Sequence, residues 1–121
     1  MTRSPADLMR RNLLDVFNEP DPARRAAVIV ETYAEDVVWH EPDRIIRGRD
    51  TLERRAQELH AENPDWVFRP ASPASGLDDI GHLEFLYGPA DEPPRASGMD
   101  IARTKDGVII ELYTIVTEIR R

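Results

Sequence analysis

The feature that most constrains the fold lies near the end of the sequence, where residues 108–116 are almost entirely apolar. The run is apolar at odd and even positions alike, so a strand formed by it needs cover on both faces. A second strand-like segment, residues 97–104, precedes it, and Asp106-Gly107 lies between the two. Asp-Gly between two apolar runs is the strongest short signal for a β-hairpin. We therefore expect a hairpin covered by helices on one face and, on the other, by a second subunit or by loops.

The first half of the chain carries the start and stop signals of three helices. Residues 4–7, Ser-Pro-Ala-Asp, begin the first helix, and residues 18–20, Asn-Glu-Pro, end it. Asp21-Pro22 begins the second by the same chemistry. Residues 50–53, Asp-Thr-Leu-Glu, form a capping box that begins the third helix, which ends at Asn63-Pro64.

Helical spacing of apolar residues predicts the buried face of each helix. These faces are Met9, Leu13, Val16 and Phe17 in the first helix, Ala23, Ala26, Ala27, Val30, Tyr33 and Ala34 in the second, and Leu52, Ala56 and Leu59 in the third.

Three further segments are rich in β-branched and aromatic residues and predict strands: residues 37–41, 66–69 and 80–87. Residues 44–49 read as a short basic connection and residues 70–79 as a loop. The order of elements predicts an α+β fold, with three helices in the N-terminal half packed on a strongly bent, mostly antiparallel sheet. A chain of 121 residues has the size of one domain, so we expect residues 1–121 to form a single domain.

Composition excludes several classes of function. The chain has no cysteine, which rules out a disulfide framework, a thiolate zinc site and a cysteine nucleophile. Acidic residues outnumber basic ones 23 to 16, so nucleic acid and anionic membranes are not expected partners. No apolar run reaches the length of a membrane span, and the N-terminus lacks the apolar stretch of a signal peptide, so we expect a cytoplasmic location.

Two segments carry a resemblance to a known family. Residues 33–42, Tyr-Ala-Glu-Asp-Val-Val-Trp-His-Glu-Pro, precede Gly48, and residues 98–103, Gly-Met-Asp-Ile-Ala-Arg, precede Asp106-Gly107. In order and spacing this resembles the nuclear transport factor 2-like superfamily, in particular its SnoaL-like branch. The resemblance implies a cone-shaped α+β barrel around a deep, largely apolar pocket. The superfamily includes isomerases, cyclases, dehydratases, epoxide hydrolases and non-enzymatic carriers.

Ketosteroid isomerases are the members whose motifs match most directly. Their general base stands immediately before the proline of the first strand, which is the position of Glu41. Their protonated acid, half of the oxyanion hole, matches Asp100, and the tyrosine that forms the other half matches Phe17, which has no hydroxyl. The Arg-x-Asp pair of limonene epoxide hydrolases has no counterpart in residues 80–87, which disfavours that chemistry.

The residues themselves also single out Glu41 and Asp100. Each lies in or at the end of an apolar strand, where a charge costs several kcal/mol unless it is paired. Burial raises the pKa of a carboxylic acid, which suits it to proton transfer near neutral pH. Two structural alternatives stay open: Glu41 pairs with Arg44 or Arg47, or Asp100 maintains the fold by a hydrogen bond to a neighbouring strand.

Two histidines are candidates to assist. Strand alternation puts Trp39 and Glu41 on one face and His40 on the other, so His40 is either a catalytic residue re-aimed by a bulge or an interface residue. His82 and Glu84 lie on the same face of their predicted strand. This face either lines the pocket or is exposed to solvent. The spacing of the histidines and acids does not support a metal site, so we expect no metal and no cofactor.

We expect an apolar pocket whose walls are Phe17, Trp39, Trp66, Phe68, His82 and Leu112. The predicted function is a SnoaL-like enzyme using cofactor-free general acid/base chemistry (isomerase, cyclase or dehydratase type) on a small hydrophobic carbonyl compound. Glu41, Asp100 and His40 are its predicted catalytic residues. The alternative is a non-catalytic ligand-binding or dimerisation module on the same fold. The expected partners are a small hydrophobic ligand and a second copy of the chain, docked through the outer face of the sheet.

Overall fold

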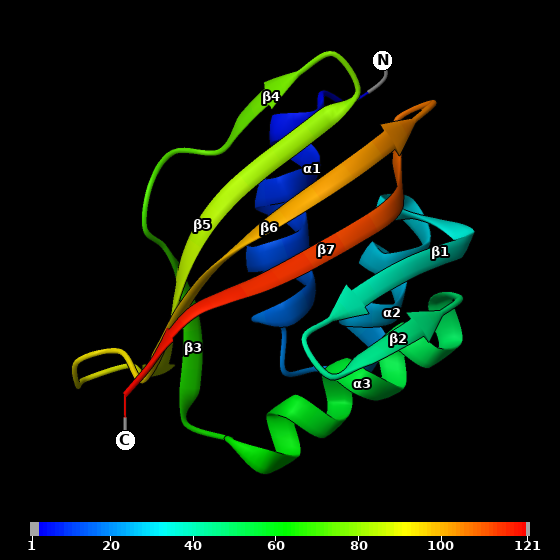
Figure 1. The fold of residues 1–121 in the computed structure, drawn as a ribbon. Coiled ribbons are helices and arrows are strands. Elements are labelled where there is room, and N and C mark those ends of the chain that lie inside the picture. Colours follow the sequence, from blue (N-terminus) through cyan, green and yellow to red (C-terminus); the bar gives the residue numbers. More distant parts are fainter. Residues whose placement is uncertain (1–2, 121) are drawn as a thin grey trace.

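A computed structural model describes residues 3–120 as a curled, unclosed sheet with helices on its concave face (Figure 1). The helical segments are α1 (Pro5–Arg10), η1 (Arg11–Phe17), α2 (Pro22–Thr32) and α3 (Arg49–Glu62). The strands are β1 (Tyr33–Glu41), β2 (Arg44–Arg47), β3 (Trp66–Pro70), β4 (Ser75–Leu77), β5 (Ile80–Pro89), β6 (Ala96–Lys105) and β7 (Val108–Ile119). The predicted α+β class is confirmed.

All seven strands belong to one sheet in the order β2-β1-β7-β6-β5-β3, with β4 also paired to β5. β1 runs parallel to β7, and the other pairs are antiparallel. The predicted hairpin is β6–β7. Its turn residues Asp106 and Gly107 have φ of 52° and 80°, the left-handed values that such a two-residue turn requires.

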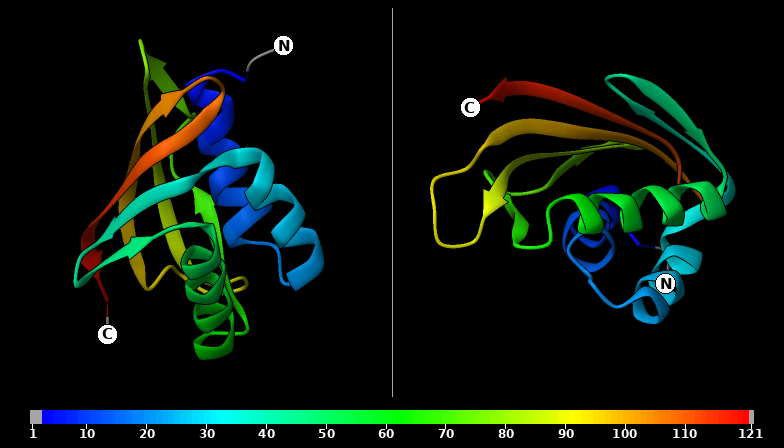
Figure 2. Two further views of the ribbon diagram at one scale, coloured as in Figure 1. Left: turned by 90° about the vertical axis from the view of Figure 1, so that its right-hand side faces the viewer. Right: turned by 90° about the horizontal axis from the view of Figure 1, so that it is seen from below.

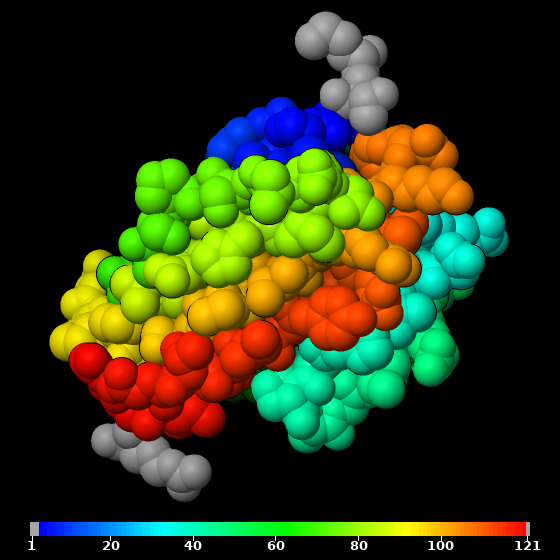
Figure 3. Space-filling view, turned by 45° about the horizontal axis from the view of Figure 1, so that its top comes forward, coloured from blue at the N-terminus to red at the C-terminus, as the bar shows by residue number. Residues whose placement is uncertain are grey.

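The sheet arches over the helices, which cover only its concave face (Figure 2). Met9, Leu13, Val16 and Phe17 are buried there, as the helical spacing predicts. On the convex face, β5, β6, β7 and β1 lie side by side (Figure 3), and no helix of residues 3–120 covers them. None of the helices within these residues is long and apolar enough to cross a membrane.

α1 and η1 form one continuous helix whose second half is π-helical. Ser4 caps its start by accepting a hydrogen bond from the Asp7 N–H at 3.2 Å, and Pro5 occupies the first turn. From Arg11 onward the wider π-helical turns bury Asn12 together with its apolar neighbours. π-Helical segments occur frequently at functional sites, and Asn12 contacts the candidate site described below.

The predicted buried face of the second helix is wrong at four of its six residues, because Ala23, Ala26, Ala27 and Val30 are exposed. Tyr33 is fully buried, as predicted, but it begins β1, because the helix ends before it. The face turned inward instead carries Arg25, Ile29 and Thr32. Arg25 is fully buried because its guanidinium donates to Glu53 Oε2 at 2.9 Å, to Gln57 Oε1 at 2.5 Å and to the Glu19 carbonyl at 2.7 Å.

Several element boundaries also differ from the predictions. The expected basic connection at residues 44–49 contains β2, an edge strand that pairs with β1, and the expected loop at residues 70–79 contains β4. α3 begins at Arg49 with Gly48 as its N-cap, so Asp50 is not the cap. These short edge strands lack the alternating apolar pattern by which longer strands are recognised.

We predict that Arg25→Met destabilises the fold by about 2–4 kcal/mol, because it leaves Glu53 without its partner and breaks the polar link between α2 and α3. Urea unfolding measures the change, with Arg24→Met, at an exposed position of the same helix, as the control. Equal stability of the two variants would contradict this role for Arg25.

Candidate functional site

A cavity of about 160 Å³ opens between the concave face of the sheet, η1 and α3. Its wall is largely aromatic: the ring centroids of Phe17 and Trp39 are 4.9 Å apart, those of Phe17 and Phe68 6.1 Å, and those of Phe68 and Tyr87 4.0 Å. The lining residues are Leu13, Phe17, Trp39, Glu41, Pro42, Leu59, Phe68, Phe85, Tyr87, Ala96, Asp100, Thr114 and Val116. Such a cavity suits a small, mostly apolar ligand, since pockets for drug-sized ligands measure about 300–1,000 Å³.

Asp100 on β6 is a buried acid in this wall, with 5% of its surface exposed. Its two carboxylate oxygens accept hydrogen bonds from opposite sides, from Asn12 Nδ2 at 2.9 Å and from Thr114 Oγ1 at 2.7 Å. Burial raises the pKa of Asp100 to about 6, against the lowering effect of these two hydrogen bonds. Within residues 3–120 no basic side chain forms an ion pair with Asp100, and the groups that act on its carboxyl are the neutral Thr114 and Asn12.

The two residues that donate to Asp100 each accept a hydrogen bond from a further donor. The indole Nε1 of Trp39 donates to Thr114 Oγ1 at 2.9 Å, and the Tyr33 hydroxyl donates to Asn12 Oδ1 at 2.5 Å. Tyr33 is fully buried, and burial, with the nearby Asp100 charge, raises its pKa well above the usual range. Asp100 therefore ends two converging chains of hydrogen-bond donors.

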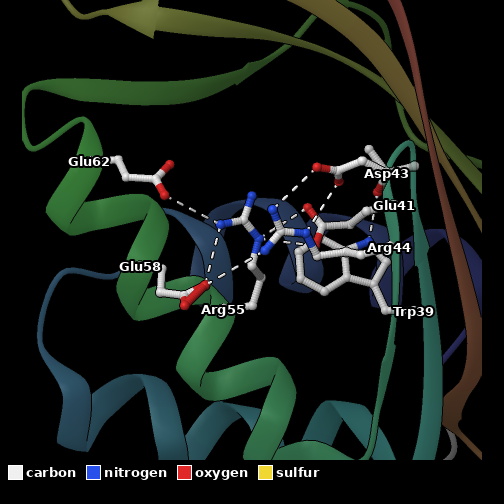
Figure 4. Close-up of polar contacts among 8 residues, drawn as sticks. Trp39, Glu41, Asp43, Arg44, Arg55, Glu58 and Glu62 are labelled. Atoms are coloured by element: carbon white, nitrogen blue, oxygen red, sulfur yellow. Dashed lines mark hydrogen bonds and ion pairs between the residues drawn. The ribbon is translucent and has the colours of Figure 1, made fainter.

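Glu41, the other acid in the wall, is held in an ion pair (Figure 4). Arg55 Nε on α3 donates to its Oε2 at 3.0 Å and its Oε1 at 3.2 Å, and the side chains are only 8% and 11% exposed. Of the two expected partners, Arg44 also forms an ion pair with Glu41, with its Nε 3.8 Å from Oε2. Arg55 also faces Glu58 and Glu62, at 3.4 and 3.7 Å. Glu41 thus has its charge compensated where Asp100 does not.

The structure does not place His40 in the cavity. Its side chain lies on the convex face, where Nε2 is 3.2 Å from Glu111 Oε2 and the ring stacks on Tyr113 at 4.4 Å. No bulge re-aims it, because β1 pairs regularly with β2 from Val38 to Glu41. His40 is therefore removed from the set of catalytic candidates.

Three of the predicted pocket residues lie elsewhere. Trp66 packs edge-on against Tyr87 without lining the cavity. His82 faces the convex side because Leu83, Phe85 and Gly81 take the buried positions of β5. Leu112 is fully buried in the core and does not line the cavity. Phe17, Trp39 and Phe68 do line the cavity.

Sequence reasoning missed Asn12, Thr114 and Arg55 as site residues. Asn12 stands inside the apolar stripe of the first helix, between Met9 and Leu13, and a polar residue there is a usable signal of a buried partner. Thr114 interrupts the apolar run of β7 in the same way. No group of three or more metal-binding side chains is placed to hold an ion in the described part of the chain.

Comparison with known families identifies the fold. A sequence model of the SnoaL-like domain matches residues 11–112, which is most of the chain. The chain belongs to the SnoaL-like family. A comparison with curated proteins finds no significant match.

Solved structures with this SnoaL-like fold include a candidate isomerase of the family from Agrobacterium tumefaciens, with a TM-score of 0.84 and 18% identity over 92% of this chain and 95% of that one. A candidate ketosteroid isomerase from Kribbella flavida has a TM-score of 0.71 and 22% identity over 97% and 81%. IdmH, a candidate polyketide cyclase from Streptomyces antibioticus, has a TM-score of 0.70 and 20% identity over 94% and 92%. At these identities the similarity establishes the fold alone.

The raised pKa of Asp100 should make the free energy of unfolding of this SnoaL-like domain depend on pH. Its pKa is about 6 when folded and near 3.8 when unfolded, so the folded state binds its proton more tightly. The resulting stabilisation is present below about pH 4 and is lost as the pH rises through 6, a change of about 3 kcal/mol.

Asp100→Asn removes this dependence. We expect the unfolding free energy of the variant, relative to wild type, to increase by up to about 3 kcal/mol between pH 4 and pH 7.5, as measured by urea unfolding at each pH. Profiles of unfolding free energy against pH that run parallel for the variant and wild type would show that Asp100 has an ordinary pKa. If the variant is also less stable by that constant amount, the result supports the alternative that Asp100 only maintains the fold.

Proposed function

We propose that this protein is a small-molecule enzyme that uses cofactor-free general acid/base chemistry on a small hydrophobic carbonyl compound, with Asp100 as the proton-transferring group. The observation that carries this proposal is an acid with a pKa of about 6, unpaired with any base of residues 3–120, in an aromatic cavity. Isomerase-type and cyclase-type names among structures of the same fold are consistent with it. The expected cytoplasmic location stays a prediction.

The proposed chemistry starts at a carbon next to the ligand carbonyl. Asp100 takes a proton from this carbon, and the electron pair of the C–H bond moves into an enolate. In a conjugated enolate, the protonated Asp100 then returns the proton to another carbon, and the carbonyl re-forms, which completes an isomerisation. Alternatively, the enolate carbon attacks a second carbonyl, whose π electrons move onto its oxygen; the ring closes, and the resulting alkoxide takes the proton from Asp100. Asp100 thereby takes the base role that the resemblance assigned to Glu41, whose charge is compensated by Arg55.

The enolate oxygen needs a hydrogen-bond donor. Phe17 lines the cavity at the position where the resemblance places the tyrosine of ketosteroid isomerases, so that hydroxyl is missing. Of the lining side chains, Thr114 and Tyr87 carry hydroxyls, and Thr114 already donates to Asp100. We assign the donor role to Tyr87, whose pKa burial raises above its usual range, so that it keeps its proton.

Hydrogen–deuterium exchange tests the proton transfer without knowledge of the natural substrate. Small cyclic ketones are incubated with the protein in D₂O, and loss of the α-proton signal is followed by proton NMR. We expect Asp100→Asn to slow exchange at least about 100-fold, while Glu41→Gln retains it within about tenfold. Unchanged exchange in Asp100→Asn would refute the role of Asp100.

The absence of a hydroxyl at Phe17 favours a second candidate function, a non-catalytic ligand-binding module. In that case the same ketones perturb the NMR signals of the cavity residues but wild-type protein exchanges no α-proton above the buffer rate. The exchange experiment therefore distinguishes the two functions.

We also propose that the protein is a homodimer through the convex face of the sheet. Met99, Ile101, Tyr113 and Ile115 form an apolar patch there, with Tyr113 and Ile115 38% and 47% exposed. β6 and β7 pair Met99 with Ile115 and Ile101 with Tyr113, so the four side chains are contiguous. A contiguous apolar patch on an uncovered face is typical of an interface.

We expect Ile115→Glu to weaken the dimer at least about tenfold, because it buries a charge in the proposed interface. Light scattering coupled to size exclusion measures the mass over a concentration series. Val30→Glu, on the exposed face of α2, is the matched control and should leave the dimer intact. A monomeric wild type would refute the proposal.

A further inference from the structure

We propose that Trp39 and Tyr33 are positioning residues that fix the direction of the hydrogen bonds around Asp100, so that Asp100 enters the reaction as a proton acceptor and not as an oxyanion donor. This inference rests on the proposed function, because it specifies which half of the acid/base chemistry Asp100 begins with. It is carried by the geometry of two chains of hydrogen bonds that converge on the carboxylate, one from β1 through β7 and one from β1 through η1.

The first chain runs from Trp39 to Thr114 to Asp100. An indole N–H can only donate, so Trp39 Nε1 occupies one lone pair of Thr114 Oγ1, at 2.9 Å. The single hydroxyl hydrogen of Thr114 is then free to point at Asp100 Oδ1, 2.7 Å away. If Asp100 carried its proton on Oδ1 and donated it to Thr114, the Thr114 hydrogen would be left in a largely aromatic cavity. An unpaired buried donor costs about 1–3 kcal/mol, so this chain favours the ionised carboxylate.

The second chain runs from Tyr33 to Asn12 to Asp100. Tyr33 donates to Asn12 Oδ1, which turns the Asn12 amide so that its N–H₂ group faces Asp100 Oδ2. The reverse orientation of the amide would present an acceptor to Asp100 and require a protonated acid. It would also leave the hydrogen of the fully buried Tyr33 hydroxyl without its acceptor. Both chains of hydrogen bonds therefore favour the ionised carboxylate of Asp100.

The remaining ionisable groups near Asp100 do not disturb this arrangement. Tyr33 on β1 keeps its proton because burial raises its pKa, and Asn12 and Thr114 are neutral. In the cavity wall, Glu41 on β1 is paired with Arg55, and Tyr87 on β5 is the other titratable group. Asp100 itself lines the cavity, so the lone pairs that the two chains leave free can accept a proton from a ligand.

The test measures the pKa of Asp100 directly in ligand-free protein, by carbon-13 NMR titration of the carboxyl signals, with Asp100→Asn used to assign the signal. Trp39→Phe and Tyr33→Phe each remove one terminal donor and keep an aromatic ring. We expect each to raise the pKa of Asp100 by about 0.5–1, the size of one net hydrogen bond. Thr114→Val should raise it similarly, and Thr114→Ser, which keeps the hydroxyl, should restore the wild-type value.

Tyr113→Phe is the matched control, because its hydroxyl lies on the convex face and should leave the Asp100 pKa unchanged. The two chains are tested by separate variants, so loss of folding in one leaves the other to decide. An unchanged pKa in the folded Trp39 and Tyr33 variants would overturn the positioning role.

A second readout links the chains to the reaction. The acid limb of the ketone-exchange rate should move to higher pH in Trp39→Phe by the same amount as the pKa measured by NMR. An exchange profile that stays in place while the pKa moves would overturn the acceptor role. Failure of the proposed function appears differently, as exchange that Asp100→Asn leaves intact, whereas the NMR titration needs no ligand and no activity.

Discussion

The interaction on which the site depends is the burial of the Asp100 carboxylate in the concave face of the sheet. A buried carboxylate is costly, and here two neutral hydrogen-bond donors, Asn12 from η1 and Thr114 from β7, offset the cost in place of a cation. The offset is incomplete, which is why the pKa lies near 6. The same incompleteness leaves the acid able to exchange a proton with a ligand near neutral pH.

The two acids of the cavity show how environment divides roles between identical chemical groups. Glu41 is neutralised by Arg55, which reaches it from α3, and its charge contributes to a network of surface ion pairs beside the cavity. Asp100 has no such partner among the described residues, and its carboxylate accepts hydrogen bonds from the neutral Asn12 and Thr114 in a largely aromatic cavity wall. Where two carboxylates share a site, such a difference in environment commonly separates the proton carrier from the structural acid.

The sequence predicted well those features that depend on local patterns. The β6–β7 hairpin follows from Asp106-Gly107, and the alternation of β1 places Trp39 and Glu41 on the concave face and His40 on the convex one. Both acids of the cavity wall were recognised because each interrupts an apolar strand. The partners were not predictable in this way. Arg55 reaches Glu41 only because of the rotation and tilt of α3, and Asn12 reaches Asp100 across 88 residues of chain.

The errors on the second helix have a related cause. Its alanines and Val30 suggested a buried stripe, but the buried face carries Arg25, whose charge is satisfied by groups on α3 and the preceding loop. Hydrophobic periodicity cannot register a buried arginine whose partners lie far along the sequence. The two aromatic residues of β3 that were both predicted to line the pocket differ in position for a similar reason. Phe68 lines the cavity, whereas Trp66 packs edge-on against Tyr87.

A crystal structure of the protein with a small phenol bound as an analogue of an enolate tests the roles of Asp100 and Tyr87 most directly. We predict that the ring lies against Phe17 and Phe68, that the phenol oxygen contacts the Tyr87 hydroxyl, and that the Asp100 carboxylate faces the ring carbon next to that oxygen. A phenol bound with its oxygen against Asp100, or with Asp100 out of contact with the ring, would contradict these roles.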